Sequence, residues 1–431
     1  MGLAIFIATI ILMVASLLFF PKITIKKHSV EAYWVIVLIG SIILLLTNTL
    51  DINLLIASLT NNSGMNPIKL VILFIMMTIL SLFLDEVGFF KWLALSLVKK
   101  INGKQIYLFL VIYGMVSILT IFTSNDVIIL TITPLICYFS KNAKINPFPY
   151  LFAVLTAANT WSIMLIIGNP TNIYLATNQG IDFMSYFRVM WFPGLVAGLT
   201  GFTMVFLLFL KELKKPMVST EIENKIPNSF LCTLGVIFVL LTIILLAISN
   251  FIGMQMWLIV LIMAIILSLI STIYLLINRR SLRPIINTYK KAPWSFIPLI
   301  LGMFVLLEGI KQGRYIESFV TLLNRGNIIF NYGISSYLVS NLMNNQPMSM
   351  LYSVMLNSVP AAIAQKATFA AIIGSNIAVL LTPIGALAGL MWINLLHKHD
   401  LKLTFFGYIK KVLLIGVVTL TLSLLALMLM F

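Results

Sequence analysis

Long apolar runs separated by short polar segments repeat along the whole chain. A helix needs about 20 residues to cross the hydrocarbon core of a bilayer. The pattern therefore predicts an all-α polytopic membrane protein with about ten transmembrane helices. We expect these helices at 3–20, 32–49, 68–84, 148–178, 189–210, 229–249, 256–277, 295–311, 366–396 and 412–430.

Two further apolar stretches, about 105–140 and 328–358, carry a polar break near the middle. We expect each to form a re-entrant hairpin of two short helices that enters the membrane and returns to the same face. Irregular backbone inside a bilayer is tolerated only where protein or a water-lined cavity surrounds it. Both hairpin tips should therefore lie in the interior of the protein.

Composition agrees with a membrane protein and argues against a nucleic-acid partner. Of 431 residues, 61% are hydrophobic and only 9% are charged, whereas soluble domains carry roughly 25% charged residues. The net charge of +16 comes from basic residues that lie between the apolar runs. This is the distribution that the positive-inside rule gives to cytoplasmic loops. We therefore expect the lipid bilayer, and no nucleic acid, around this chain.

The loop charges also predict how the first hairpin sits in the membrane. The loop at 22–27 contains three lysines and should be cytoplasmic, whereas the loop at 51–67 contains none and should be outside. Lys104 and Lys141 flank the stretch at 105–140. Both can be cytoplasmic only if that stretch enters and leaves by the same face.

The two halves of the chain share a pattern of polar residues. Under the predicted topology the first hairpin opens to the cytoplasm and the second to the outside, which is the inverted-topology repeat common in secondary transporters. The expected divisions are an N-terminal half at 1–210, a cytoplasmic linker at 211–228 and a C-terminal half at 229–431. The matching positions are Asn125-Asp126 with Asn344-Asn345, Asn159 with Asn376, Gly168 with Gly385, and Pro170 with Pro383.

The tip of the first hairpin carries Ser124, Asn125 and Asp126. A carboxylate within the membrane is costly and commonly marks an ion or proton pathway. We therefore predict that Asp126 binds and releases the coupling proton. The same three residues also form a good helix N-cap sequence. The two interpretations are compatible, because such a cap points the helix N-terminus at whatever binds there.

A second group of candidate residues surrounds a predicted break in the span at 148–178. Glycine and proline together interrupt a helix and free its carbonyl groups, while asparagine and threonine add neutral oxygen and amide groups. Such a break could coordinate Na⁺ or bind a small oxyacid, although a simple proline kink would share part of the pattern. The candidates are Asn159, Thr160, Gly168, Asn169, Pro170, Thr171 and Asn172.

The second half supplies corresponding candidates at its hairpin tip and at a break in the span at 366–396. An asparagine cluster of this kind could also serve helix packing alone. The candidates for substrate or ion binding are Asn341, Asn344, Asn345, Ser375, Asn376, Thr382, Pro383 and Gly385.

Several other kinds of site are not indicated. Cys137 and Cys232 both lie in apolar segments, so we expect neither a disulfide nor a thiolate metal site. The chain contains no P-loop and no GxSxG motif. We therefore expect no cofactor beyond a coupling ion, H⁺ or Na⁺, and ATP-driven transport would need a separate ATPase subunit.

Several local motifs resemble the ion-transporter superfamily, and in particular its arsenite permease (ArsB) family. NhaD-type Na⁺/H⁺ antiporters and divalent-anion symporters share some of these features. The resemblance covers nearly the full length of the chain. The motifs lie at 84–92, 125–134, 291–294, 343–347 and 373–388.

The resemblance implies a plasma-membrane carrier that exports arsenite or antimonite in exchange for protons, in some cases with an ATPase partner or as a homodimer. Asp126 would match the acidic position of the family after the hairpin-tip asparagine. Two positions differ, since the family tends to carry an acid at Asn376 and a lysine at Leu380. The Gly168–Asn172 break is more similar to the sodium- and anion-handling branches.

We therefore expect a multi-pass secondary transporter, not an enzyme, with proton-coupled arsenite or antimonite efflux as the leading function. The alternative on the same scaffold is Na⁺/H⁺ antiport or Na⁺-coupled uptake of a carboxylate. Two other classes fit less well. One is a passive channel. The other is an intramembrane enzyme that uses Asp126 with His397, which is disfavoured because His397 lies in a predicted cytoplasmic loop.

Overall fold

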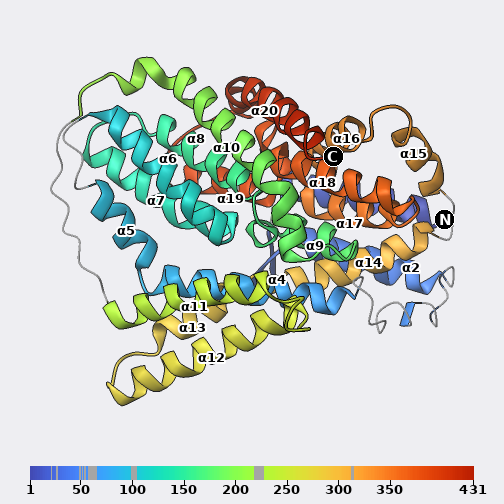
Figure 1. The fold of residues 1–431 in the computed structure, drawn as a ribbon, viewed down its shortest axis with the longest axis horizontal. Helices are drawn as coiled ribbons and strands as arrows, with labels where there is room; N and C mark the ends of the chain where they lie inside the picture. The colour runs from blue at the N-terminus through green and yellow to red at the C-terminus, as the bar shows by residue number, and fades with distance from the viewer. Residues whose placement is uncertain are drawn as a thin grey trace.

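The chain is almost entirely helical, as the apolar runs predict (Figure 1). A computed structural model describes residues 1–20, 22–25, 28–47, 50, 52, 55–56, 66–98, 104–217, 228–311 and 315–431. Within these residues, 8 helices are long and apolar enough to cross a membrane, and two shorter apolar helices lie near the N-terminus. The predicted all-α polytopic class is confirmed.

The first repeat consists of a long helix, a short surface helix, a hairpin, an interrupted helix and a second long helix. In chain order these are α4 (Pro67–Glu86), α5 (Phe89–Val98), α6 (Gln105–Phe122), α7 (Asn125–Asn142), α8 (Phe148–Trp161), the 3-10 turn η1 (Ile166–Gly168), α9 (Pro170–Asn178) and α10 (Phe183–Leu213).

The second repeat has the same order of elements. These are α14 (Phe296–Lys311), α15 (Tyr315–Leu323), α16 (Ile328–Met343), α17 (Asn345–Leu356), α18 (Ala361–Ile377), the 3-10 turns η2 (Ala378–Leu380) and η3 (Pro383–Gly385), α19 (Leu387–Lys398) and α20 (Phe405–Met428). Both predicted hairpins are therefore present, as α6–α7 and α16–α17.

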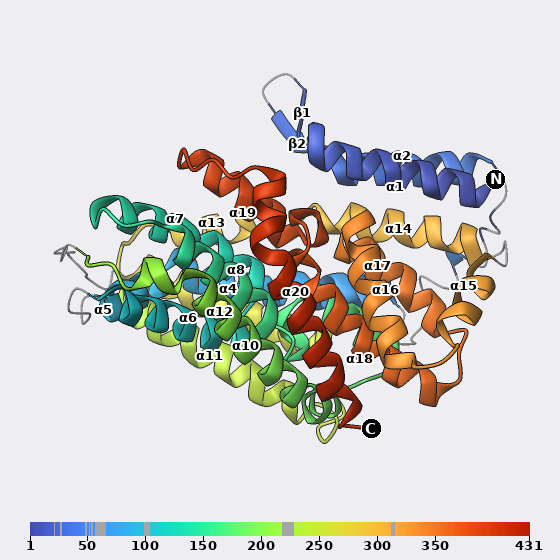
Figure 2. The same ribbon diagram turned by 90° about the horizontal axis from the view of Figure 1, so that it is seen from above.

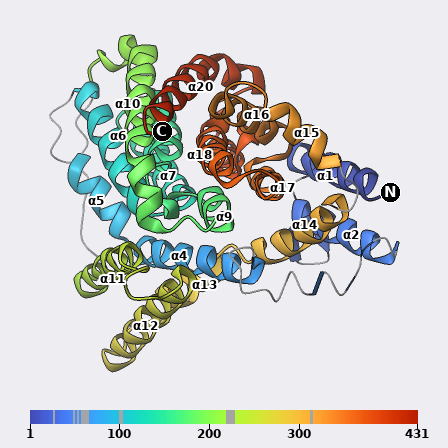
Figure 3. The ribbon, with the colours of Figure 1, turned by 45° about the vertical axis from the view of Figure 1, so that its right-hand side comes forward.

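The two repeats pack against each other reciprocally. The hairpin helix α7 of the first repeat lies on α19 of the second, and α17 of the second lies on α9 of the first. The long final helices α10 and α20 also run side by side (Figures 1 and 3). This exchange of equivalent contacts is the packing expected of two repeats related by a pseudo-twofold axis.

The remaining helices form a layer along one side of the repeats. At the N-terminus, α1 (Gly2–Phe19) and α2 (Ala32–Leu46) pack on each other and on α14 (Figure 2). Farther along, α11 (Ser229–Ala247), α12 (Met256–Ile277) and α13 (Arg283–Lys291) surround α4. An ion pair between Lys291 and Glu86 joins α13 to α4.

The segment between α1 and α2 contains a small feature that the sequence analysis missed. Strands β1 (Lys22–Ile25) and β2 (His28–Glu31) form a two-stranded antiparallel sheet in which Ile23 pairs with Val30. β-branched residues favour such extended pairing. The lysines of this segment predict its side of the membrane and carry no signal for a hairpin.

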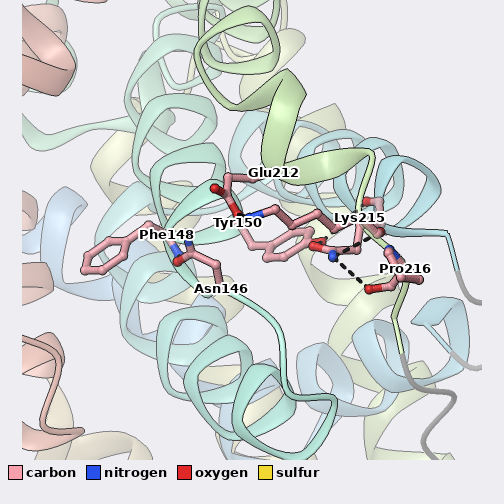
Figure 4. A network of polar contacts seen from close by, with 7 residues as sticks. Asn146, Phe148, Tyr150, Glu212, Lys215 and Pro216 are labelled. Carbon is pink, nitrogen blue, oxygen red and sulfur yellow. Dashed lines mark hydrogen bonds and ion pairs between the residues drawn. The ribbon is translucent and has the colours of Figure 1, made fainter.

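The connection between the halves is described only in part. Helix α10 continues to Leu213, three residues into the predicted linker at 211–228, and residues 218–227 lie outside the described part of the chain. At the start of this connection, the side chain of Gln105 donates to the carbonyl oxygens of Lys215 (3.1 Å) and Pro216 (3.2 Å). The Tyr150 hydroxyl donates to Gln105 Oε1 at 2.9 Å (Figure 4).

This network closes the open end of the first hairpin. Gln105 is the first residue of α6, Tyr150 lies in the first turn of α8, and Lys215 follows α10. A single buried amide thus joins three elements of one repeat. Because a buried amide is costly unless it is hydrogen-bonded, the three elements are held in a fixed relation at this end.

Helices α8 and α10 approach closely because glycine faces an indole ring. A Cβ atom at Gly198 would lie 2.2 Å from Trp161 Cε2. We predict that Gly198→Ala destabilises the protein by about 1–3 kcal/mol, since the ring or α10 must shift. The thermal unfolding of purified protein in detergent measures this effect.

Gly114 is the matched control for this substitution. It lies within α6, and a Cβ atom there would meet nothing within 4 Å. Gly114→Ala should leave stability unchanged or raise it by up to about 1 kcal/mol, because alanine favours the helix. Equal destabilisation by both substitutions would contradict the proposed contact between Gly198 and Trp161.

Candidate functional site

The tips of the two hairpins have equivalent geometry. Helix α7 begins at Asn125 after Ser124, and α17 begins at Asn345 after Asn344. The structure therefore aligns Asn125 with Asn345, one position away from the pairing expected from the sequence, and Asp126 with Gln346. Asn344 has a positive φ of 73°, which is uncommon for a residue other than glycine.

The helix breaks also have equivalent geometry. In the first repeat, Asn169 accepts a hydrogen bond from the backbone N–H of Thr171 (3.1 Å), and Pro170 opens α9. In the second, the Thr382 hydroxyl accepts from the N–H of Ile384 (3.3 Å). Gly168 and Gly385 each end a 3-10 turn. Each has backbone oxygen 2.4 Å from where a Cβ atom would lie, so only glycine fits there.

The breaks free backbone carbonyl groups inside the membrane, and side-chain donors satisfy them. In the first repeat, Asn172 Nδ2 donates to the carbonyl oxygens of Ser162 (2.8 Å) and Leu165 (3.2 Å). In the second repeat, Asn341 Nδ2 donates to Ala378 O (3.0 Å). Asn344 Nδ2 likewise donates to Ile384 O (2.9 Å).

Two tyrosines perform the same task from equivalent positions. Tyr186, the fourth residue of α10, donates to Ile163 O at 2.8 Å. Tyr408, the fourth residue of α20, donates to Val379 O at 2.5 Å. The sequence analysis missed this pair because each tyrosine lies near the start of an apolar run. Their equivalent positions, each the fourth residue of a final helix, are the one sequence signal that relates the two tyrosines.

A single asparagine joins the two breaks. Asn376 Oδ1 accepts from Asn169 Nδ2 (2.9 Å) and from the Ser162 hydroxyl (3.0 Å). Its Nδ2 donates to Asn172 Oδ1 (2.7 Å). Beside it, the hydroxyls of Thr171 and Ser375 lie 3.2 Å apart. These groups are fully or almost fully buried, so the cross-link lies in the interior of the protein.

The first hairpin tip connects to this cross-link through α8. Asn125 Nδ2 donates to Asn159 Oδ1 (3.2 Å), and the Ser162 hydroxyl donates to Asn159 O (3.2 Å). Ser162 was not among the predicted residues, although it lies between Thr160 and Gly168. The Thr160 hydroxyl donates to the backbone of its own helix, at Thr156 O (2.8 Å), rather than to a side chain of the cross-link.

The second hairpin tip forms a separate network around η3. Asn341 Oδ1 accepts from the N–H (3.0 Å) and the hydroxyl (2.7 Å) of Thr382. The structure therefore groups the predicted residues into two clusters. One contains Asn125, Asn159, Asn169, Thr171, Asn172, Ser375 and Asn376, and the other contains Asn341, Asn344 and Thr382.

Three oxygen atoms at the tips have no partner within the described residues. They are Ser124 Oγ, Asn125 Oδ1 and Asn345 Oδ1, and all three are buried. Buried polar atoms in native proteins nearly always have a partner. Among the thirteen buried side-chain atoms of the described residues that have no partner, these three lie together at the two equivalent tips, where a ligand could complete their hydrogen bonding.

Asp126 is the acidic residue of this region. Its carboxylate is partly buried and forms neither a hydrogen bond nor an ion pair with any described residue. By contrast, Asp85 accepts from Thr131 (2.8 Å), and Glu308 pairs with Lys311. Of these three carboxylates, Asp126 is therefore the one whose protonation no hydrogen bond or ion pair to a described residue opposes.

The spaces beside the second tip are small. One, of about 20 Å³, lies between Gln346 and Ser349 of α17, α9, α4 and α14. Another, of about 10 Å³, lies between Asn344, Tyr33 and α1. Each offers room for about one water molecule. A substrate could enter here only if α9 and α17 separate from α4 and α14.

The two tyrosines provide a test of the break geometry. Tyr186→Phe and Tyr408→Phe should each destabilise the protein by about 1–3 kcal/mol, because each leaves a buried carbonyl oxygen unpaired. Tyr138, which is 64% exposed, is the control, and Tyr138→Phe should change stability by less than about 0.5 kcal/mol. The measurement is the thermal unfolding temperature of all three variants. Equal unfolding temperatures would contradict the hydrogen bonds assigned to Tyr186 and Tyr408.

Comparisons with known proteins agree with the resemblance seen in the sequence. Residues 23–374 match the citrate transporter family (CitMHS). A putative arsenical pump membrane protein of Bacillus subtilis is 27% identical over 367 residues, covering 78% of this chain and 82% of that protein. An arsenical pump membrane protein of Escherichia coli is 28% identical over 379 residues, covering 83% and 86%.

A solved structure shows a similar fold. The crystal structure of the Alcanivorax borkumensis YdaH transporter aligns with a TM-score of 0.55 at 13% identity, covering 99% of this chain and 97% of that chain. This likeness concerns the fold alone. With the family match over most of its length, the chain belongs to the citrate transporter family within the ion-transporter superfamily and is a multi-pass membrane transporter.

Proposed function

We propose that this protein exports arsenite or antimonite across the plasma membrane in exchange for protons. The observation that carries the proposal is the set of unpaired, uncharged acceptors at the two hairpin tips, Ser124 Oγ, Asn125 Oδ1 and Asn345 Oδ1. The names of the Bacillus subtilis and Escherichia coli relatives support the same substrate.

The chemistry of the substrate fits such a site. As(OH)₃ and Sb(OH)₃ are uncharged at neutral pH and carry three hydroxyl groups, each of which can donate a hydrogen bond. A site for them needs acceptors and no compensating charge. The breaks at 162–169 and 378–386 contain no lysine, arginine or histidine. Binding there would satisfy oxygens that are otherwise costly to bury.

Asp126 is the proposed proton carrier. A carboxylate in the membrane interior is more stable when neutral, so protonation would favour movement of the tip through an apolar environment. Asp126 would take up a proton from outside and then release it to the cytoplasm, which would return the site to its starting state. The free energy of the proton gradient would then drive the neutral substrate outward.

The alternative is Na⁺/H⁺ exchange or Na⁺-coupled transport of a carboxylate. The description of the family as citrate transporters favours it, and neutral carbonyl oxygens at a broken helix suit Na⁺. A citrate ion, however, would need positive charge, and no basic side chain lies in either break. Bound Na⁺ would have to supply that charge.

Two predicted partners extend the proposal. The chain itself contains no P-loop for ATP. A soluble ATPase subunit would therefore be the source of any energy from ATP hydrolysis. A second copy of the chain would give a homodimer. Both would be tested by copurification from the native membrane.

Flux in proteoliposomes separates the two substrate classes. We expect an outward-directed arsenite flux that is driven by an imposed pH gradient and is unaffected by Na⁺. Asp126→Asn should reduce the proton-driven flux at least about 100-fold, since the variant side chain cannot titrate. Arsenite, Na⁺ and citrate are assayed in parallel with the same vesicles.

Glu308→Gln is the matched control. It also removes one carboxylate, but one that is paired with Lys311 at the end of α14, and it should retain coupled flux. Proton-driven flux that persists in Asp126→Asn would refute the role of Asp126. If citrate moves with Na⁺ and arsenite does not move, the arsenite proposal is wrong and Na⁺-coupled carboxylate transport takes its place.

A second test compares an unpaired with a paired asparagine. Asn345→Ala removes an acceptor that has no partner, so it should lower arsenite flux about 10-fold with little change in thermal stability. Asn376→Ala removes four buried hydrogen bonds, three of them to the first repeat, and should lower both flux and stability. Equal loss of stability in the two variants would indicate that Asn345 is structural.

A further inference from the structure

A cavity of about 380 Å³ lies away from the helix breaks, where three elements end on one side of the protein. Its wall is formed by the first turns of α4, the turn between α9 and α10, and the turn between α11 and α12. The volume is within the range of small-ligand sites. None of the residues of the two break clusters lines it.

Among the described residues, one basic and one acidic side chain line the cavity. Lys69 lies in the first turn of α4, and Asp182 is the N-cap of α10. Partial burial alone would raise the pKa of Asp182. Hydrogen bonds from Ser185, Asn250 and the Met184 N–H outweigh that effect and hold its pKa below the ordinary value. Asp182 is therefore an anion at neutral pH.

The surroundings of the cavity resemble a membrane–water interface. Trp257 lines it, and indole rings gather at the headgroup level of bilayers. Phe251, in the adjoining turn, is 89% exposed. The turns at 179–182 and 250–255 contain no lysine or arginine, which is typical of loops on the outer side of the membrane.

We propose that this cavity binds a phosphoethanolamine group, with the phosphate at Lys69 and the primary ammonium at Asp182. A point charge such as the lysine ammonium suits a phosphate. The hydroxyl of Thr177 adds an acceptor for an N–H donor. A quaternary ammonium group would fit less well, because it has no N–H to donate and the described lining residues include a single aromatic ring, that of Trp257.

Two sources could supply this chemistry: phosphatidylethanolamine of the outer leaflet, or a soluble phosphoethanolamine diester. Either would join the α9–α10 turn to the first turn of α4. The α9–α10 turn already meets the α11–α12 turn through Asp182 and Asn250. The occupant would therefore stabilise the contact between α9–α10 and the helices around α4. This role is independent of the transported substrate.

The test is thermal unfolding of the full chain in detergent with added phosphatidylethanolamine, phosphatidylcholine, phosphatidylglycerol or soluble glycerophosphoethanolamine. Phosphatidylethanolamine should raise Tm by about 2–4 °C more than the other two lipids. Lys69→Gln and Asp182→Asn should each lose that difference. Asparagine is itself a good N-cap, so Asp182→Asn should still fold.

Lys402→Gln is the matched control, because Lys402 is exposed in the loop between α19 and α20. It should keep the full lipid-specific shift. A rise in Tm with glycerophosphoethanolamine would identify a soluble diester as the occupant. No rise in Tm with this compound, together with a rise with phosphatidylethanolamine, would identify the lipid. Equal shifts with all three lipids, or retention of the difference in Lys69→Gln and Asp182→Asn, would overturn the proposal.

Discussion

Two helix breaks inside the membrane impose the constraint on which the rest of this structure depends. Lipid offers no hydrogen bonds, so every carbonyl group that a break releases must find a donor within the protein. Asn172 and Tyr186 supply donors at the first break, and Asn341 and Tyr408 supply donors at the second. The final helices α10 and α20 must therefore lie against the breaks, and this requirement explains why they pack side by side.

The same constraint explains the close contact between the repeats. Asn376 of the second repeat uses both its donor and its acceptor on residues of the first break. The side chains of Asn169, Asn172 and Asn376 thus find hydrogen-bond partners in the opposite half of the chain. Buried hydrogen bonds therefore fix the positions of the candidate site residues at the breaks more firmly than apolar packing alone would.

The hairpin tips differ from the breaks in one physical respect. At the breaks the side-chain amides have partners, whereas Asn125 Oδ1 and Asn345 Oδ1 at the tips have none among the described residues. Paired groups maintain the architecture, and unpaired groups are available to a ligand. This distinction separates asparagines that hold the fold from those proposed to bind a ligand, which residue type alone could not do.

The amino-acid sequence by itself determined the helical class, both hairpins, and the location of the breaks at Gly168 and Gly385. These features depend on local properties: the length of apolar runs, the conformational freedom of glycine and the missing N–H of proline. Only the tertiary structure decided that Asn376 bonds to Asn169 and Asn172, that Tyr186 and Tyr408 serve the breaks, and that Lys69 and Asp182 share a cavity. Such contacts join residues far apart in the chain, and they depend on how the helices cross, which the periodicity of a single sequence does not specify.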